Sequence, residues 1–343
     1  MSSARIIPFL PNQRVPIQGL ESEPARAPQL LDQAREKIRT LQYSLRTEQT
    51  YLDWVKRYLL FTQAKRSPKD MGAVEVRAFL THLAVDQKVS AATQNQALNA
   101  LLFLYKRVLQ KDLGDIGEFD RAPKTDRRPL VLSPEEARKV IDCLEGRFHL
   151  MGVLLYGTGL RLMELVRLRV RDVDFQLNQI VVRDGKGEKD RFTMLPRTSR
   201  TELEAHLAQV KRLHEMDLAE GNGAVALPLA LEQKPPTVLK DWGWQYVFPS
   251  KSLSEDAPGV VRRHHIHETT LQTAVKKAVR RAGLEKPATV HTFRHSFATH
   301  LLEAGYDVRT VQELLGHKAV STTMVYTRVL NSGAKGVRSP ADF

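Results

Sequence analysis

The sequence predicts a mainly α-helical protein of two domains, with a small antiparallel β-sheet in the second. Three observations predict this fold. Apolar residues recur at spacings of three and four over residues 30–113, two runs of β-branched and apolar residues flank a Gly-Lys-Gly turn, and 343 residues with 42% hydrophobic content suffice for two ordinary cores. We expect a flexible arm over residues 1–28, a helical domain over residues 29–120, a linker over residues 121–130 and a mixed domain over residues 131–343.

The first domain is expected to contain about four helices. The segments LLDQAREKIRTLQYSLRTEQTYLDWVKRYLLFT, GAVEVRAFLTHLA and ATQNQALNALLFLYKRVL repeat apolar residues at helical spacing. Ser44 and Thr47 are candidate N-cap residues for the second of these helices. Lys56 and Arg57 lie near its end, where the helix dipole favours positive charge.

The second domain begins after a segment that lacks helical periodicity. DLGDIGEFDRAPKTDRRPLVLSPEE holds two Gly, three Pro and a basic run, which is typical of a linker. Ser133 is a candidate N-cap for the next helix, because Pro134 and two glutamates follow it. Further along, QIVVRDGKGEKDRFTMLP predicts a β-hairpin whose tip projects Lys186.

The overall composition favours a polyanionic partner. The formal net charge is +13, and the 52 Lys and Arg are scattered along the chain, which suits DNA or RNA; a basic protein without such a partner is the alternative. The single cysteine, Cys143, excludes a disulfide framework and a cysteine-based zinc site, and it favours a reducing compartment. Residues 1–28 fail as a signal peptide, and no segment reaches about 18 consecutive apolar residues. We therefore expect a cytoplasmic protein without a membrane partner.

Arg161 follows a glycine-rich turn in LLYGTGLRLMELVRLRVRDVDF. Gly157 and Gly159 predict a tight turn, with a helix that starts near Leu160. The helix dipole disfavours an arginine in a first turn unless an anion binds there, so Arg161 is a candidate anion-binding residue. The alternative is a surface arginine that pairs with Glu164 three residues on.

The segment HTFRHSFATHLL predicts a helix with a polar face beside its buried face. The buried stripe consists of Phe293, Phe297 and Leu301. His291 and Arg294 are three residues apart, so they share a helix face beside this stripe, where the wall of a cleft would lie. We expect His295 and His300 to be structural or exposed to solvent.

The next segment, GYDVRTVQELLGHKAVSTTMVYT, predicts a short helix that Asp307 caps and that Gly316 ends in a left-handed conformation. His317 then lies in the following loop, and Tyr326 lies on a short terminal helix. Considered alone, a tyrosine on such a helix is more often a core residue than a nucleophile.

Taken together, these residue types fit phosphoryl transfer to a tyrosine. Two arginines, one lysine and two histidines around a phosphodiester would neutralise it and would stabilise the charge on a pentacoordinate phosphorus without a metal ion. A tyrosine hydroxyl could then attack phosphorus and form a phosphotyrosine, which a DNA hydroxyl later resolves. Because this exchange conserves the bond energy, we expect no cofactor, no ATP and no metal.

At this point the sequence resembles the tyrosine recombinases of the phage-integrase type, through five motifs that occur in the order of that family. The motifs are GTGLRLMEL with Arg161, GKGEKDR with Lys186, HTFRH with His291 and Arg294, LLGH with His317, and the following Tyr326. They span about half of the chain, and their separations also fit the family.

The resemblance implies a set of residues that bind the phosphate. Arg161 and Arg294 would bind the scissile phosphate. His317 would hydrogen-bond a phosphate oxygen, and Glu164, which matches an acidic position of the family, would orient Arg161. All four residues would therefore act on a single phosphodiester.

The resemblance also implies how protons and bonds move. Tyr326 would be the nucleophile that forms a 3′-phosphotyrosyl bond, and His291 would serve in acid–base chemistry. Lys186 would protonate the leaving 5′ oxygen; Lys189 is the rival for this role, and the match to the Gly-Lys-Gly motif favours Lys186.

The likeness extends to the first domain, which resembles the core-binding, SAM-like domain of the family. The resemblance therefore implies a C-shaped clamp of two domains on DNA. Because strand exchange between two duplexes needs four active sites, it implies a homotetramer on DNA, formed from chains that are monomeric when free. The segment VLNSGAKGVRSPADF after the tyrosine is a candidate for exchange between subunits.

Three segments resemble integron integrases more specifically: YSLRTEQTYLDWVKRYLLF, GVVRRHH and KPATVHTFRHSFATHLL. That subfamily recombines gene cassettes at attI sites and at folded single-stranded attC sites, and an extra segment grips bases flipped out of the folded hairpin. Here the insertion would fall within residues 221–268. Its candidate DNA-binding residues are Trp242, Trp244, Arg262, Arg263, His264 and His265. The two tryptophans could instead cap the edge of a core.

Three alternative functions remain. The first is a Xer-like or phage integrase that acts on duplex sites, against which only the insertion argues. The second is a DNA-binding protein that retains the fold but cuts nothing, although all the expected polar residues are present. The third is a metal-dependent nuclease or hydrolase that uses His264, His265, His267, Glu268 and the later histidines. The consecutive histidines lack the spacing of helical metal ligands, and no Asp-rich cluster accompanies them.

Overall fold

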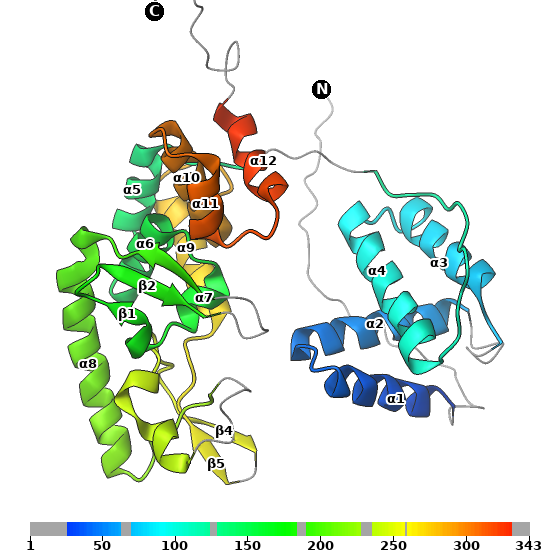
Figure 1. Cartoon of the computed structure of the whole chain (residues 1–343), viewed down its shortest axis with the longest axis horizontal. Coiled ribbons are helices and arrows are strands. Elements are labelled where there is room, and N and C mark those ends of the chain that lie inside the picture. The colour runs from blue at the N-terminus through cyan, green and yellow to red at the C-terminus, as the bar shows by residue number, and fades with distance from the viewer. Residues whose placement is uncertain are drawn as a thin grey trace, which may run out of the picture. The chain divides into compact units, whose positions relative to one another are not determined.

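The computed structural model divides the chain into two compact units, Met1–Asp126 and Arg127–Phe343. It describes residues 26–62, 70–123, 129–183, 190–227, 235–257 and 259–330. Within these ranges both units are mainly helical, and the second also holds two small antiparallel sheets (Figure 1). The predicted fold class is therefore confirmed. No helix among the described residues is long and apolar enough to cross a membrane.

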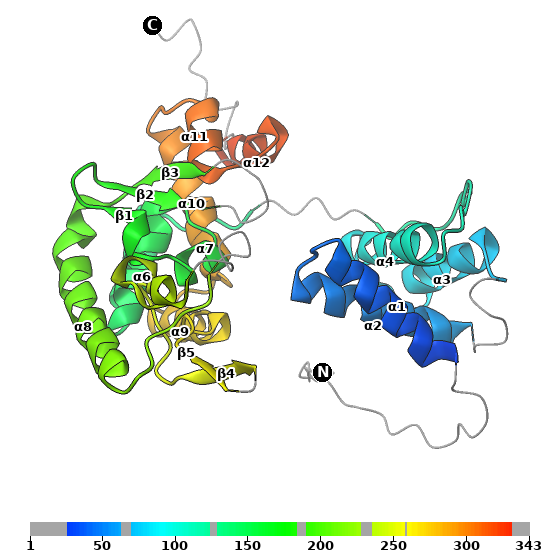
Figure 2. The same ribbon diagram turned by 60° about the horizontal axis from the view of Figure 1, so that its bottom comes forward.

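The described part of the first unit contains four helices, shown from a second side in Figure 2. They are α1 (Arg26–Thr40), α2 (Leu45–Phe61), α3 (Ala73–Val85) and α4 (Ala91–Phe103), and α4 continues into a π-helical segment, Leu104–Val108. The side chain of Ser44 accepts a hydrogen bond of 3.1 Å from the backbone N–H of Thr47, so Ser44 is the N-cap of α2. The helices that the apolar spacing predicts are present.

Two tyrosines lie at the centre of the first unit. Tyr58 and Tyr105 are fully buried, and their hydroxyl oxygens are 2.8 Å apart, within hydrogen-bonding distance. Apolar residues of α2, α3 and α4 surround them, so each hydroxyl is satisfied inside an otherwise apolar core. This unit therefore has a core of its own.

The described part of the second unit contains eight helices. They are α5 (Pro134–Asp142), α6 (Arg147–Thr158), α7 (Leu162–Val166), α8 (Arg200–Ala219), α9 (Glu268–Arg281), α10 (Val290–Glu303), α11 (Val308–Leu315) and α12 (Val320–Leu330). The start of α5 has the predicted cap: Ser133 Oγ accepts from the N–H of Glu136 at 3.2 Å, and the Glu136 carboxylate accepts from the N–H of Ser133 at 2.8 Å.

A three-stranded antiparallel sheet packs on these helices, in the order β1 (Val173–Asp174), β2 (Gln179–Val182) and β3 (Arg191–Met194). In β2, Ile180 and Val182 are buried in the main core of the unit. Val182 pairs with Arg191 at the end where the hairpin loop leaves the sheet. The predicted hairpin is present, whereas the two-residue strand β1 was not predicted.

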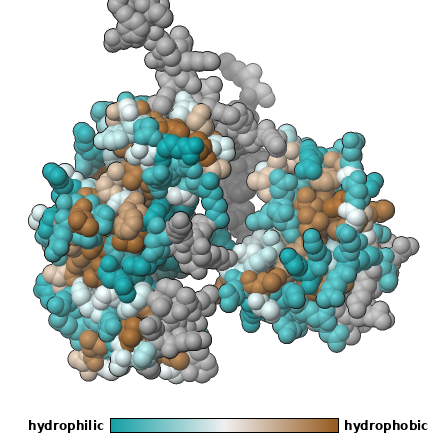
Figure 3. Space-filling model, in the orientation of Figure 1, coloured by the Kyte–Doolittle hydropathy of each residue, from teal (hydrophilic) through white to brown (hydrophobic). Residues whose placement is uncertain are grey.

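Two parts of the second unit lie at opposite ends of it. Figures 1 and 2 both show α11 and α12 at one end and a second hairpin, β4 (Ser254–Ala257) and β5 (Val260–Arg262), at the other. α10 packs against α6 and α12, which ties the α11–α12 end to the main core. Hydrophilic residues cover most of the face seen in Figure 3, with apolar residues in scattered patches.

Candidate active site

The turn between α6 and α7 brings the backbone close to α10. Gly159 ends α6 in a left-handed conformation with φ of 66°, and a Cβ atom there would collide with the ring of Phe297. The prediction for this turn was partly wrong, because Gly157 lies inside α6. The next helix begins at Leu162, so Arg161 is its N-cap residue and has an extended backbone.

Arg161 and Glu164 form a local network at the start of α7. The backbone N–H of Arg161 donates to Glu164 Oε2 at 2.8 Å, and Arg161 Nη1 donates to Oε1 at 2.7 Å. Arg161 Nη2 also donates to the carbonyl of Gly316 at 3.3 Å. The ion pair between Arg161 and Glu164, which the sequence suggests as an alternative to an anion site, is thus present. However, 40% of the Arg161 side chain remains exposed. The guanidinium therefore keeps a face that a ligand can reach.

Glu164 binds a second arginine, which sequence reasoning missed. Arg191 donates from Nη2 to Glu164 Oε2 at 2.6 Å and from Nη1 to Oε1 at 2.9 Å, and its Nε donates to the carbonyl of Leu314 at 3.0 Å. Burial alone would raise the pKa of Glu164, but the hydrogen bonds and charge of Arg191, followed by those of Arg161, lower this pKa to about 2. The carboxylate is therefore ionised and shared between two cations.

Arg294 is the most enclosed cation of the cluster, with 3% of its surface exposed. Its Nη1 donates to the carbonyl of Gly159 at 2.6 Å, and its Nη2 donates to the carbonyl of Leu315 at 2.7 Å. Nη2 also contacts His317 Nε2 at 3.0 Å. Burial, followed by the charge of Arg161, lowers the pKa of Arg294 to about 10. The two arginines of the candidate site therefore lie close enough to repel each other.

His317 follows α11, which has the predicted ends: Asp307 caps its start, and Gly316 is left-handed at its end, with φ of 64°. A guanidinium can only donate, so His317 Nε2 must accept from Arg294. The ring proton then lies on Nδ1, which contacts Thr323 Oγ1 at 2.9 Å. Burial, followed by the charge of Arg294, lowers the pKa of His317 to about 4. The imidazole is thus held neutral.

Tyr326 is buried in a small apolar cluster with residues of α10 and α11. It is therefore a core residue, as expected for a tyrosine on a short terminal helix. The ring of Tyr326 stacks on that of His317, with centroids 6.1 Å apart. Its hydroxyl lies 3.2 Å from Nδ1 of His295, a residue that the sequence predicts to be structural or exposed to solvent. Burial raises the pKa of Tyr326, and the charge of Arg294 opposes this rise.

His291 lies at the edge of the cluster, on the first turn of α10. Its side chain is exposed, and its ring centroid is 5.5 Å from that of His295. It also lines a cavity of about 680 Å³ on the α9 side, whose wall includes Lys276, Arg280 and Lys286. A basic, open surface thus adjoins the site at this point.

Lys186 and its rival Lys189 lie outside the described residues. The strands on either side of their loop are described, and Arg191 at the start of β3 is bound to Glu164. The hairpin that carries the predicted lysine is therefore anchored to the same carboxylate as Arg161.

Several predicted DNA-contacting residues of the insertion are instead part of its interior. Trp244 is 8% exposed and packs in an apolar cluster, which supports the core-edge reading, and Trp242 is partly buried beside the ring of His214. Arg263 is 7% exposed, and its Nε and Nη2 donate to the carboxylate of Asp217 at 2.5 and 2.6 Å. In contrast to the prediction, Trp244 and Arg263 are therefore buried structural residues: Arg263 ties the insertion to Asp217 of α8, and Trp244 packs within the apolar cluster of the insertion itself.

The remaining candidates of the insertion are more accessible. Arg262 Nη1 donates to Asp256 Oδ2 at 3.2 Å, and His264 Nε2 contacts Oδ1 of the same carboxylate at 2.5 Å. The ring of His265 packs edge-on against Tyr246, with centroids 5.3 Å apart. Arg262, at the end of β5, and His264, two residues beyond it, are thus partly exposed. The β4–β5 hairpin lies at the opposite end of the unit from α12 (Figure 1).

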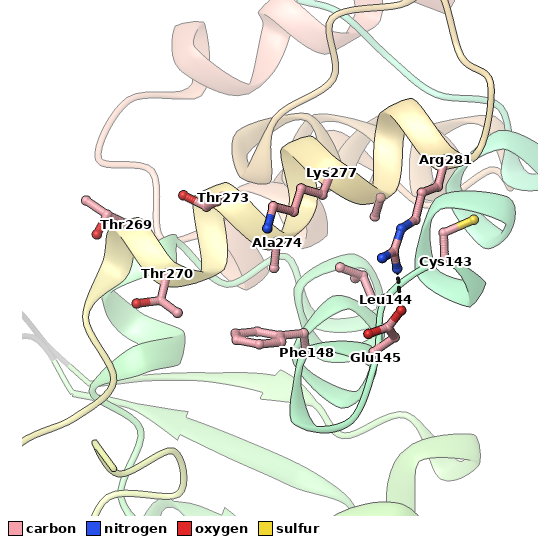
Figure 4. Close-up of a pocket in the computed structure, with 11 residues that line it drawn as sticks. Cys143, Leu144, Glu145, Phe148, Thr269, Thr270, Thr273, Ala274, Lys277 and Arg281 are labelled. Atoms are coloured by element: carbon pink, nitrogen blue, oxygen red, sulfur yellow. Dashed lines mark hydrogen bonds and ion pairs between the residues drawn. The ribbon is translucent and has the colours of Figure 1, made fainter. Parts of the chain in front are cut away.

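A separate pocket of about 460 Å³ lies between α9 and the turn that joins α5 to α6 (Figure 4). Cys143 and Phe148 line one side, and Arg281 from α9 forms an ion pair with Glu145 across it. None of the residues of the Arg294 cluster lines this pocket. Across the described ranges, no group of three or more His, Cys, Asp or Glu side chains is arranged to hold a metal ion.

Comparison with known proteins identifies two matching family models. The model of the phage integrase family matches residues 131–332, and the model of the phage integrase N-terminal SAM-like domain matches residues 30–115. Proteins named integrase/recombinase from Escherichia coli and Pseudomonas aeruginosa are each 51% identical over 320 residues, which cover 93% of this chain and 95% of the relative. Tyrosine recombinase XerA of Thermococcus kodakarensis is 31% identical, over 82% of this chain and 84% of its own length.

Solved structures share the fold at low sequence identity. The XerH site-specific recombinase bound to its difH substrate, in a pre-cleavage complex, has a TM-score of 0.57 and 22% identity, over 88% of this chain and 80% of that chain. A lambda integrase dimer bound to a COC′ core site has a TM-score of 0.57 and 18% identity, over 87% of this chain and 94% of that chain. The chain therefore belongs to the phage integrase family of tyrosine recombinases.

Proposed function

We propose that this tyrosine recombinase is an integron integrase, which inserts and excises gene cassettes at attI sites and at folded single-stranded attC sites. Family membership supports the class of reaction. The observation that carries the proposal is the convergence of Arg161, Arg294, His317 and Tyr326 at one end of the second unit, through the contacts described above.

In this proposal the scissile phosphate lies between the two arginines. A phosphodiester there would offset the burial and the charge of Arg161, which together lower the pKa of Arg294, and it would meet the open face of Arg161. The bonds of Arg294 to two carbonyls and to His317 use three of its five N–H groups, which leaves two for phosphate oxygens. Glu164 keeps Arg161 oriented while the phosphate binds.

The reaction then exchanges one phosphodiester for another. The Tyr326 oxygen attacks phosphorus, a bond to the 3′ phosphate forms, and the bond to the 5′ oxygen breaks. Lys186 protonates the leaving oxygen, His291 takes part in acid–base chemistry, and His317 hydrogen-bonds a phosphate oxygen. A 5′ hydroxyl of the partner strand reverses these steps and releases the tyrosine, so no cofactor enters the sequence.

The proposed partner is DNA, on which four copies of the chain assemble. The net charge of +13 favours a polyanion, and the XerH and lambda integrase structures are complexes with recombination sites. Four active sites are required because two duplexes each exchange two strands. We propose that the chain is monomeric when free and tetrameric on paired sites.

The choice of integron substrate depends on the insertion within residues 221–268. Trp242, Arg262, His264 and His265 are partly exposed there, and they offer aromatic and basic groups to unpaired bases. A Xer-like or phage integrase acting on duplex sites is the second candidate, and the Xer recombinases among the relatives favour it.

The test is a suicide-cleavage assay in EDTA with nicked DNA, in which loss of a short fragment traps the covalent adduct. The probes are the folded bottom strand of an attC site and its fully duplex form. Wild type should form an adduct with the folded strand in preference to the duplex, and Tyr326→Phe should form none. Tyr156→Phe is the matched control, because Tyr156 also hydrogen-bonds a histidine of α10, at 2.8 Å, but lies outside the proposed site.

The outcomes separate the candidates. A Tyr326-dependent adduct on the duplex alone would move the substrate to the Xer-like class. Cleavage that requires a divalent metal, or an adduct that survives in Tyr326→Phe, would contradict the phosphotyrosine mechanism. DNA binding without an adduct on either probe would favour the non-catalytic alternative.

A further inference from the structure

The hydroxyl of the proposed nucleophile is held by a histidine that the motif-based roles leave unused. Tyr326 Oη lies 3.2 Å from His295 Nδ1, and the two ring centroids are 5.5 Å apart. His295 follows Arg294 directly on α10, and one helical turn before it lies His291. The contact therefore joins the nucleophile to the helix that also carries a phosphate-binding arginine.

A proton acceptor is needed at this position. Burial raises the pKa of Tyr326 above its usual value, so the hydroxyl keeps its proton at neutral pH. The proton must leave when the oxygen bonds to phosphorus, and an acceptor has to lie within hydrogen-bonding reach of it. His295 meets this requirement in the described structure.

The other two histidines of the site fit the requirement less well. Both ring nitrogens of His317 are engaged, Nε2 by Arg294 and Nδ1 by Thr323. His291 is exposed, and the ring that it contacts is that of His295, not that of Tyr326. Of the three imidazoles, only that of His295 therefore has a nitrogen within hydrogen-bonding distance of the Tyr326 hydroxyl in the described structure.

The surroundings of His295 keep it in the form that can accept a proton. Burial, followed by the charges of His291 and Arg294, lowers the pKa of His295 to about 4. Its Nδ1 can therefore carry a lone pair towards the tyrosine hydroxyl throughout the neutral range. A bound phosphate would add a negative charge beside the ring and would stabilise the imidazolium that forms.

We propose that His295 is the proton acceptor for the Tyr326 nucleophile, an inference that rests on the proposed function. As Tyr326 Oη bonds to phosphorus, its O–H bond breaks and the proton moves to His295 Nδ1. The bond from phosphorus to the 5′ oxygen breaks, and that oxygen takes a proton from Lys186. In the rejoining step His295 returns its proton to the tyrosine, so the ring ends the cycle neutral.

The first measurement is the rate of adduct formation on the nicked DNA probes by wild type, His295→Leu and His295→Asn. An asparagine amide can hydrogen-bond the hydroxyl from nearly the same position but cannot take up its proton. Both variants should form the adduct at least about 100-fold more slowly than wild type, because a general base typically contributes about 10²- to 10⁴-fold to the rate. His300→Leu is the matched control, because it removes a histidine–tyrosine hydrogen bond on the same helix, to Tyr156.

Two further readouts distinguish proton transfer from simple support of the fold. Wild-type rates should be nearly constant from about pH 6 to about pH 9, whereas His295→Leu should gain rate as the tyrosine itself ionises. DNA with sulfur in place of the scissile 5′ oxygen has a leaving group that needs no proton, so it should rescue Lys186→Ala but not His295→Leu. Thermal unfolding checks that each variant is folded.

These experiments distinguish failure of the role proposed for His295 from failure of the phosphotyrosine mechanism. Wild-type rates in His295→Leu, or full recovery in His295→Asn, would overturn the role as proton acceptor while leaving the phosphotyrosine mechanism intact. Rescue of His295→Leu by the sulfur-containing DNA would reassign it to the leaving group and would also overturn the role. Absence of an adduct with wild type on both probes would overturn the two proposals together.

Discussion

At the residue scale, the site is a set of cations arranged around one carboxylate. Glu164 binds Arg161 and Arg191, while Arg294 has carbonyls and a neutral histidine as its partners. Arg294 therefore has no carboxylate partner among its described hydrogen bonds, and its pKa is lowered to about 10. This imbalance of charge is what a phosphodiester would correct.

The pair of Arg191 and Glu164 should matter for both stability and adduct formation. Arg191→Met would leave Glu164 partly unpaired in a site where its side chain is 16% exposed, and loss of one partner from a buried pair costs about 3–5 kcal/mol. Arg191→Lys keeps the charge but loses the two-pronged contact, so it should fall between wild type and Arg191→Met. Urea unfolding and adduct formation on the nicked probe measure the two effects.

The control for this prediction is an exposed pair. Arg200 and Glu204 form an ion pair on α8 with side chains 45% and 49% exposed, so Arg200→Met should cost less than about 1 kcal/mol. Equal losses in Arg191→Met and Arg200→Met would show that the pair at Glu164 has no special role.

The free energy of unfolding should decrease as the pH is lowered from about 6.5 to about 4. Burial lowers the pKa of both His295 and His317 from 6.5 to about 4, so in this window the unfolded chain binds more protons than the folded chain. The stability from the two neutral rings is fully present above pH 6.5 and is lost as pH falls through 4. Calorimetry of wild type and of His295→Leu, compared at about pH 7 and about pH 5, should show a smaller pH dependence in the variant. The same slope in both proteins would argue against a buried neutral ring at this position.

At the element scale, the sequence predicts where helices begin and end better than it predicts which distant residues they contact. Helical periodicity and the caps at Ser133, Asp307 and Gly316 are local signals, and the structure confirms them. Burial of Arg263 could not be predicted, because its partner Asp217 lies 46 residues away in the sequence, on α8. A two-residue strand such as β1 has too few residues to show a period.

The same limit applies within the candidate site. The motifs point to Arg161, Arg294, His317 and Tyr326, and these residues lie together. Arg191 was missed because its role depends on contacts with α7 and α11 that only the fold creates. His295 was missed for the same reason, since its partner is on α12.

The turn at Gly159 allows a direct test of how tightly α6 must approach α10. Gly159 and Gly283 have the same φ of 66°, but a Cβ at Gly283 would meet nothing within 4 Å. Both alanine variants should lose about 1–2 kcal/mol from the left-handed backbone. Gly159→Ala should lose about 1–3 kcal/mol more, because its methyl group meets the Phe297 ring. Urea unfolding measures both, and equal losses would contradict the close approach.

At the scale of the whole molecule, the charge of +13 predicts strongly salt-dependent DNA binding. If 6–10 phosphates are neutralised, affinity should fall about 10³- to 10⁵-fold between 50 and 200 mM salt. Fluorescence anisotropy on labelled attC DNA measures this slope. A change of less than about tenfold over the same range would mean that few phosphates are contacted.

The state of assembly is a separate prediction of the same proposal. Sedimentation should give a monomer for the free chain and a species with four chains on paired DNA sites. A stable tetramer without DNA would contradict the proposal that the DNA sites drive assembly.

The apolar cluster around Tyr326 has a further consequence. It consists of residues of α10, α11 and α12 and is separate from the main core of the second unit. A small satellite core opens at a lower free energy than the domain that carries it. Amide hydrogens of α12 should therefore exchange with solvent before those of α6, with the main core still closed. Opening of α12 would carry Tyr326 away from Arg294 and would release His317 from Thr323, so the proposed nucleophile would leave the site and His317, a partner of Arg294, would lose its support at the same time.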